Sequence, residues 1–158
     1  MLNTYLEIGQ HIFDMMPEIE WIDRDKGQID HEEEFNSILC PAVLLDFGET
    51  NWTGLSRGNQ LGDLTITTKL IFVKPGETFT RDNNPLQEYA VFNALADKLH
   101  QVVGQLEYVH ERRRSSDYFT KYWYVIEQQY DLEVNYEVPI RTIPKPVPTI
   151  STNIILPV

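Results

Sequence analysis

The sequence has a single cysteine, Cys40, and no apolar run that approaches the roughly 20 residues needed to span a bilayer. One thiol cannot form an internal disulfide, so the fold does not depend on an oxidising compartment. Residues 1–10 contain no lysine or arginine, which is unlike a secretory signal peptide. These absences predict a cytoplasmic protein that does not bind membranes.

Basic residues are also scarce, since 13 lysines and arginines stand against 24 acids and the net charge is −11. Nucleic-acid-binding domains usually carry a basic face that neutralises phosphates, and here only residues 112–114 form a basic run. The composition therefore disfavours sequence-specific nucleic-acid binding and anionic membranes. It favours a basic protein, or a basic patch on another copy of the chain, as partner.

What remains is typical of a globular protein. The chain has 158 residues, of which 42% are hydrophobic, and this is enough for one domain with its own core. We assign that domain to residues 1–137. Residues 138–158 differ in composition, because five of the prolines lie there: Pro139, Pro144, Pro146, Pro148 and Pro157. Proline favours extended conformations, which predicts a proline-rich C-terminal arm.

Hydrophobic periodicity and breaker residues predict two main helices, over 4–16 and 85–103. Strands are expected over 18–23, 41–47, 64–73, 106–113 and 121–134, with a glycine-rich loop over 48–62 and a bend or bulge inside the last strand. Because helices and strands do not strictly alternate, the order α-β-β-β-α-β-β predicts an α+β fold with a mostly antiparallel sheet.

The spacing also predicts which side chains are buried. On the strand over 64–73, one face carries Leu64, Ile66, Leu70 and Phe72. On the first helix the apolar stripe is Leu2, Tyr5, Leu6, Gly9, Ile12, Phe13 and Met16. On the second helix, which Asn84 would cap and Gly104 would end, the stripe is Val91, Leu95, Leu99 and Val102.

One catalytic pattern occurs, at Gly54-Leu55-Ser56-Arg57-Gly58, which matches the G-x-S-x-G nucleophile elbow of serine hydrolases. That chemistry needs a strand before the serine and a helix after it, whereas a strand is expected to follow here. A glycine-rich loop is therefore the favoured interpretation. A hydrolase that uses Ser56 is kept as an alternative.

A second pattern resembles a calcium loop, with Asp23, Asp25 and Glu34 as ligands. Gly27 and Ile29 come one position too early for an EF-hand loop, so a solvated turn is favoured and a calcium-responsive binding module is the second alternative. The four histidines have no metal-ligand spacing, and no phosphate-binding glycine loop is present. We therefore expect no metal and no cofactor.

Two charged runs and the arm are the candidate interface. The acidic run contains Asp30, Glu32, Glu33 and Glu34, and the basic run contains Arg112, Arg113 and Arg114. Each run alone is usually a solvated face, but in a self-associating protein the two would meet and set the orientation of an interface. The arm alternates as an edge strand does, through Ile150 and Ile154, and could add a strand to a neighbour.

Several stretches together carry a resemblance to a known family. They are Gly27-Gln28-Ile29-Asp30, the run from Cys40 to Phe47, and Gln60 to Leu64, accompanied by Met15-Met16-Pro17 and Tyr122-Trp123-Tyr124-Val125. Over roughly residues 1–137, the chain resembles small prophage-borne proteins encoded among phage head and tail morphogenesis genes. Its plan is similar to that of phage tail-terminator and head–tail joining proteins.

This resemblance implies a structural protein of the virion without an active site. Proteins of this kind are α+β subunits that assemble, often as rings, with other tail or connector proteins. The expected function is therefore phage or prophage tail assembly through self-association, with the protein cytoplasmic during assembly and later part of the virion.

Overall fold

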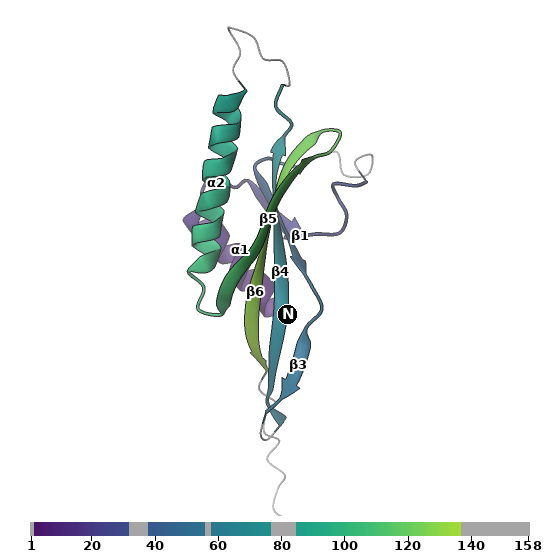
Figure 1. Ribbon diagram of the computed structural model, residues 1–158, viewed down its shortest axis with the longest axis vertical. Helices are drawn as coiled ribbons and strands as arrows, with labels where there is room; N and C mark the ends of the chain where they lie inside the picture. Colours follow the sequence, from purple (N-terminus) through teal and green to yellow (C-terminus); the bar gives the residue numbers. More distant parts are fainter. Residues whose placement is uncertain (1, 32–37, 56–57, 77–84, 137–158) are drawn as a thin grey trace, which may run out of the picture.

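The computed structural model describes residues 2–31, 38–55, 58–76 and 85–136, and for Leu2 and residues 111–114 it describes the backbone only. The molecule is elongated, with a long twisted sheet and helices along it (Figure 1). The helices are α1 (Leu2–Met15) and α2 (Leu86–Gly104). The strands are β1 (Trp21–Arg24), β2 (Ala42–Phe47), β3 (Asn51–Gly54), β4 (Gln60–Val73), β5 (Val109–Phe119) and β6 (Trp123–Tyr136).

The described strands form one six-stranded sheet in the order β1-β2-β4-β6-β5, with β3 also paired to β4. β1 and β2 are parallel, and all the other pairs are antiparallel. The prediction of an α+β fold with a mostly antiparallel sheet is therefore confirmed.

The centre of the sheet is the antiparallel pair of β4 and β6. Its register runs without a shift from Gln60 opposite Tyr136 to Val73 opposite Trp123. The side chains of β4 alternate as predicted, because Leu64, Ile66, Leu70 and Phe72 are buried while Thr65, Thr67 and Lys69 are half-buried on the other face. Both helices pack on the first of these faces.

The main core lies between this face and the helices. α1 contributes Ile8 and Ile12, and α2 contributes Leu99 and neighbouring apolar residues. Gln128 of β6 is a buried polar link within this core. Its side-chain amide donates to the Ala96 carbonyl of α2 at 3.1 Å, and its Oε1 accepts from the Tyr130 hydroxyl at 2.7 Å.

A smaller core lies on the opposite face, where residues between β1 and β2 cross the sheet. Ile29 and Ile38 from this segment pack against Leu44, Ile71 and other sheet residues. The segment starts with a tight turn in which Gly27 has φ 78°. The buried Gln28 closes this turn, because its Oε1 accepts from the Lys26 N–H at 2.6 Å and its amide donates to the Arg24 carbonyl at 2.7 Å. Gln28 and Ile29 therefore have structural roles.

The prediction of one loop over 48–62 is wrong, because β3 forms inside it and β4 begins at Gln60. β3 pairs with the same edge of β4 as β2 does. The pairing of β3 with β4 is offset by one residue from the pairing of β2 with β4. The Trp52 ring lies over Gly62, where a Cβ would come within 2.8 Å of it. The observed order is therefore α-β-β-β-β-α-β-β.

The last two strands also differ from the prediction. β5 is longer and reaches Phe119, β6 is shifted by two residues, and the two are joined by a tight hairpin over Lys121 and Tyr122. The register shifts fall in β5, between Val109 and Glu111 and between Arg112 and Arg114, whereas the pairing of β6 with β4 is regular. The expectation of a bulge inside the last strand is therefore wrong, because the extra residues lie on its partner β5.

Three predicted helix core positions are wrong, since Leu6, Phe13 and Val91 are 56%, 43% and 63% exposed. His11 of α1 lies with its Nε2 3.0 Å from the Val102 carbonyl oxygen of α2. Glu18, which follows α1, makes an ion pair with Lys98 of α2. The earlier turns of α2 extend beyond α1 (Figure 1), which leaves Val91 exposed. The N-cap of α2 is Pro85, without a side-chain cap, and Gly104 is its last helical residue.

Candidate interaction surface

Aromatic side chains from α2 and three strands pack at the end of the sheet where β4 ends. The rings of Phe72 and Phe92 stack with centroids 4.0 Å apart, and the Tyr124 ring lies 5.4 Å from Tyr89 and 4.9 Å from Phe119. The Tyr124 hydroxyl donates to Asp117 at 3.1 Å, and burial, followed by this carboxylate, raises the pKa of Tyr124 to about 12. The cluster fixes the first turns of α2 on the sheet.

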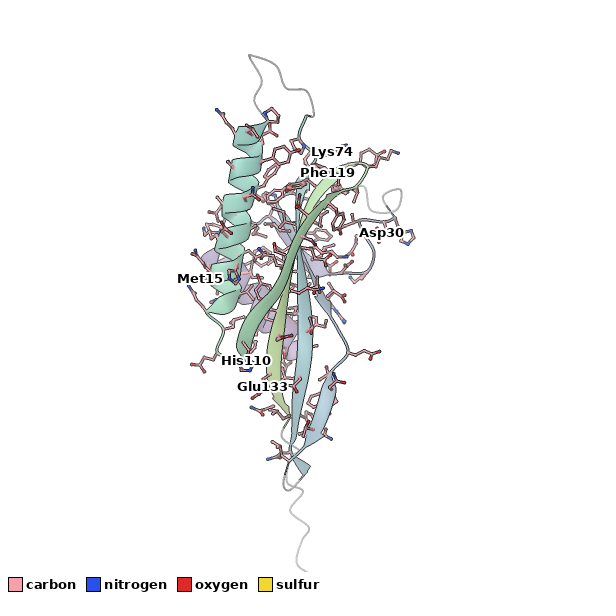
Figure 2. All side chains as sticks on the ribbon, in the orientation of Figure 1. Met15, Asp30, Lys74, His110, Phe119 and Glu133 are labelled. Atoms are coloured by element: carbon pink, nitrogen blue, oxygen red, sulfur yellow. The ribbon has the colours of Figure 1, made fainter. Side chains whose placement is uncertain are left out.

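The same end of the molecule also carries exposed apolar side chains, and we call it the apolar end. Lys74 and Phe119, which lie at this end, are labelled in Figure 2. Two lysines border the apolar end, with the Lys74 Nζ 5.6 Å from the Phe119 ring centroid and the Lys121 Nζ 4.7 Å from that of Tyr122. Exposed apolar patches with a polar rim are typical of protein contact surfaces. The exposed residues that define it are Leu39, Val73, Leu86, Val91, Phe119 and Tyr122.

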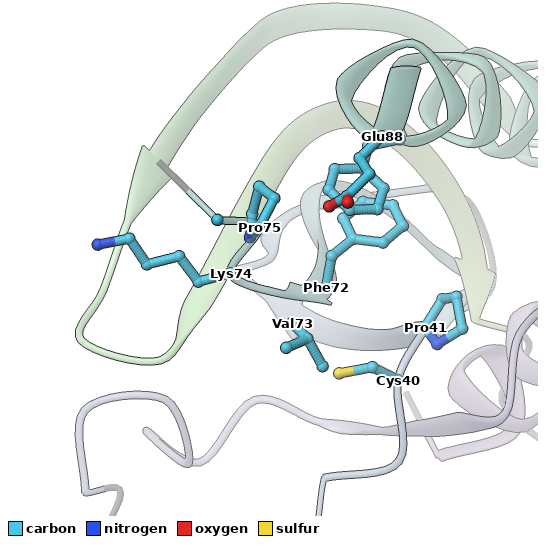
Figure 3. A pocket seen from close by; sticks show the side chains of 9 residues that line it. Cys40, Pro41, Phe72, Val73, Lys74, Pro75 and Glu88 are labelled. Carbon is cyan, nitrogen blue, oxygen red and sulfur yellow. The ribbon is translucent and has the colours of Figure 1, made fainter. Parts of the chain in front are cut away.

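A pocket of about 410 Å³ opens in the apolar end. Its walls come from the residues just before β2, the end of β4 with the residues after it, and the first turns of α2, and they include Pro41, Phe72 and Phe92. Figure 3 shows Phe72 between Glu88 on one side and Val73 and Cys40 on the other, with Lys74 pointing away. The volume lies in the range of roughly 300–1,000 Å³ that small-ligand pockets occupy. The pocket is therefore an open, mainly apolar depression whose charged lining residues are Glu88 and Lys74.

Cys40 is half-buried in the wall of this pocket. Burial raises the pKa of its thiol to about 11. The thiol is therefore protonated at neutral pH and is a weak nucleophile.

β5 lies at the edge of the sheet and offers main-chain groups for pairing. In the hairpin, the Thr120 N–H donates to the Trp123 carbonyl at 2.9 Å. Hydrogen-bonded and non-hydrogen-bonded pairs alternate along an antiparallel ladder, so Ser115, Asp117 and Phe119 occupy non-hydrogen-bonded positions opposite β6. Their N–H and C=O groups point away from β6, toward a side of β5 on which the structure places no further strand within the residues it describes.

The predicted interface residues are only partly described. Asp30 is exposed at the end of the tight turn, whereas Glu32, Glu33 and Glu34 lie outside the described residues. Arg112, Arg113 and Arg114 lie on β5, with their backbone alone described. Ile150 and Ile154 lie outside the description, as does the whole of 137–158.

Asp30 lies near β5 on the face opposite the helices. Burial raises the pKa of Tyr118 on β5; the Lys69 ammonium opposes this rise, and the carboxylates of Glu127, Asp30 and Asp25 add to it. The Asp30 carboxylate therefore acts electrostatically on Tyr118 of β5.

Neither chemical alternative gains support from the described residues. Ser56 itself lies outside them, and its flanks form a β3–β4 hairpin in which the Leu55 N–H donates to the Asn59 carbonyl at 2.7 Å. The following element is thus a strand, as expected, and not the helix that a nucleophile elbow requires.

The two aspartates of the possible calcium loop are each held by a lysine. Lys26 lies 3.2 Å from the Asp23 carboxylate, and Lys69 makes an ion pair with Asp25. Asp25 also accepts a hydrogen bond from the Gly27 N–H at 2.9 Å. This pattern is that of a closed turn, and no cluster of three or more His, Cys, Asp or Glu suited to a metal occurs in the described part of the chain.

The described helices include none that is long and apolar enough to cross a membrane. In comparisons with known proteins, no protein-family model matches the chain. No curated protein matches its sequence either.

Proposed function

We propose that the chain is a structural, non-enzymatic assembly protein of a phage or prophage tail, a tail-terminator or head–tail joining subunit that acts through self-association. The observation that carries the proposal is the open edge of β5 beside the apolar end. Ser115, Asp117 and Phe119 direct main-chain donors and acceptors outward there, next to the exposed Phe119 ring. An edge of this kind pairs readily with a strand from another chain.

The two halves of β5 differ in how open they are. Bulges and charged side chains protect edge strands from pairing, and both register shifts and the arginine run lie between Val109 and Arg114. From Arg114 to Phe119 the register is regular. We expect a strand from another copy to pair with this regular half, and the alternating segment around Ile150 and Ile154 is the candidate strand. Other tail or connector proteins would contact the assembled ring.

The proposal is tested by blocking the edge without breaking the ladder. Ser115→Pro removes an outward N–H, whereas Ser116→Pro removes an N–H that faces β6 and serves as the matched control. Light scattering after size exclusion, over a concentration series of the full chain, should show oligomers for the wild type. Ser115→Pro should weaken association at least tenfold with a small effect on the unfolding midpoint, and Ser116→Pro should lower that midpoint.

A wild-type chain that stays monomeric at high concentration, alone and with purified tail tubes, would contradict self-association. Electron microscopy of the tube ends separates ring formation from other oligomers. If Ser115→Pro associates as the wild type does, the β5 edge is not the contact.

A further inference from the structure

The pocket in the apolar end has the chemistry of a site for proline-rich segments. The half-buried Phe92 ring, stacked at 4.0 Å on the buried Phe72, forms its aromatic wall, and Pro41 and Val73 add apolar surface. Proline-rich segments dock in aromatic-lined grooves because their extended helix is preformed and little entropy is lost on binding. Glu88, in the first turn of α2, adds one carboxylate at the rim.

The chain itself contains a matching segment. Pro144-Lys145-Pro146-Val147-Pro148 places three prolines around one lysine. Its charge is also complementary, because residues 137–158 carry Arg141 and Lys145 against the single acid Glu137, whereas the whole chain has a net charge of −11. A lysine between prolines can bring its ammonium to a carboxylate such as that of Glu88.

The length of the chain decides whether this contact forms within one molecule. The arm begins after Tyr136, opposite Gln60, whereas the pocket lies beside Val73 at the other end of the ladder. Fourteen residues on each strand make this ladder roughly 43 Å long at about 3.3 Å per residue. Pro144 comes only eight residues after Tyr136 and reaches at most about 29 Å. Lys145, which comes nine residues after Tyr136 and reaches at most about 32 Å, therefore falls short of Glu88 in its own pocket.

We propose that residues 144–148 of one copy dock in the Phe72–Phe92 pocket of another copy, with Lys145 beside Glu88. The proposal rests on the proposed function, because it names the partner through which the chain self-associates. The occupant is the same protein in trans, and each copy gives one arm and receives one.

Cys40 provides a direct test, because it is the only cysteine and it lines the pocket. An unlabelled wild-type chain, whose thiol is Cys40, is mixed with a ¹⁵N-labelled Cys40→Ser/Val147→Cys chain. A disulfide between positions 40 and 147 can then form only between two molecules. Copper–phenanthroline is used as oxidant, and the linked peptides are quantified by mass spectrometry. The matched control is Cys40→Ser/Asn51→Cys, which places the thiol on exposed β3.

We expect the disulfide between positions 40 and 147 to form at least tenfold more than the one between positions 40 and 51. Equal yields overturn the docking of the arm. Light scattering on the same mixtures separates the two proposals: oligomers without the disulfide refute only the docking, whereas monomers without it refute self-association as well.

A charge exchange tests the pairing of Lys145 with Glu88. Glu88→Lys in the wild-type partner should lower the crosslink yield several-fold, and Lys145→Glu in the labelled partner should restore it. A Glu88→Lys partner that crosslinks as well as the wild type would refute this pair. A loss that Lys145→Glu does not restore would refute it as well.

Discussion

Tyr130→Phe tests the polar link that joins α2 to the sheet. Tyr130 is fully buried, and its hydroxyl donates to Oε1 of Gln128, which is 1% exposed. The substitution keeps the ring and leaves this buried oxygen without its donor. A buried polar group that loses its partner costs about 1–3 kcal/mol. At roughly 2–4 °C per kcal/mol for a chain of this size, the unfolding midpoint should fall by about 2–12 °C.

The matched variants are Gln128→Met and the double variant Tyr130→Phe/Gln128→Met. The free energy of unfolding of each is measured by urea titration, with tryptophan fluorescence as the signal. Replacing both partners by apolar groups of similar shape is nearly neutral. Tyr130→Phe should therefore cost far less in the Gln128→Met background than in the wild type, with an unchanged slope against urea. Equal costs in both backgrounds would show that the hydrogen bond to Gln128 contributes nothing, and would refute the reasoning.

Two further predictions concern the strand and the thiol that the fold positions. Gly62→Ala should destabilise the chain by about 1–3 kcal/mol and change the tryptophan emission, because the new Cβ would lie 2.7 Å from Thr50 and 2.8 Å from Trp52. Gly104→Ala, where a Cβ meets nothing within 4 Å, should instead be neutral or stabilise by up to about 1 kcal/mol. Alkylation of Cys40 by iodoacetamide should rise with pH toward its pKa of about 11 and, at pH 8, be roughly 100-fold slower than in the urea-unfolded chain. A native rate equal to the unfolded rate would show that burial does not protect the thiol.

The strands with one buried face could be predicted, because burial imposes an alternation that the sequence displays. β4 is the clearest case, since Leu64, Ile66, Leu70 and Phe72 all face the helices. β3 could not be predicted in this way, because all of its residues are exposed. Its pairing with β4, and the ring of Trp52 over Gly62, hold it in place.

The pocket could not be predicted because it has no local pattern. Cys40, Phe72 and Phe92 come from segments that are distant in the sequence, and each alone reads as an ordinary core residue. The pocket forms where the first turns of α2, which extend beyond α1, lie beside the end of β4 and the residues before β2. For the same reason Val91 has helical core spacing and is nevertheless exposed.

Docking of the arm in trans restricts how two copies can be arranged. The arm and the pocket lie at opposite ends of a ladder about 43 Å long. Copies lying side by side in the same direction would hold each arm as far from the next pocket as from its own, so the reach excludes this arrangement. An antiparallel pair would exchange two arms and stop at a dimer, whereas head-to-tail contacts continue along the assembly and form a ring where the rotation closes. The proposed ring requires the second arrangement, so an assembly whose mass never exceeds that of a dimer would contradict the ring without contradicting the docking.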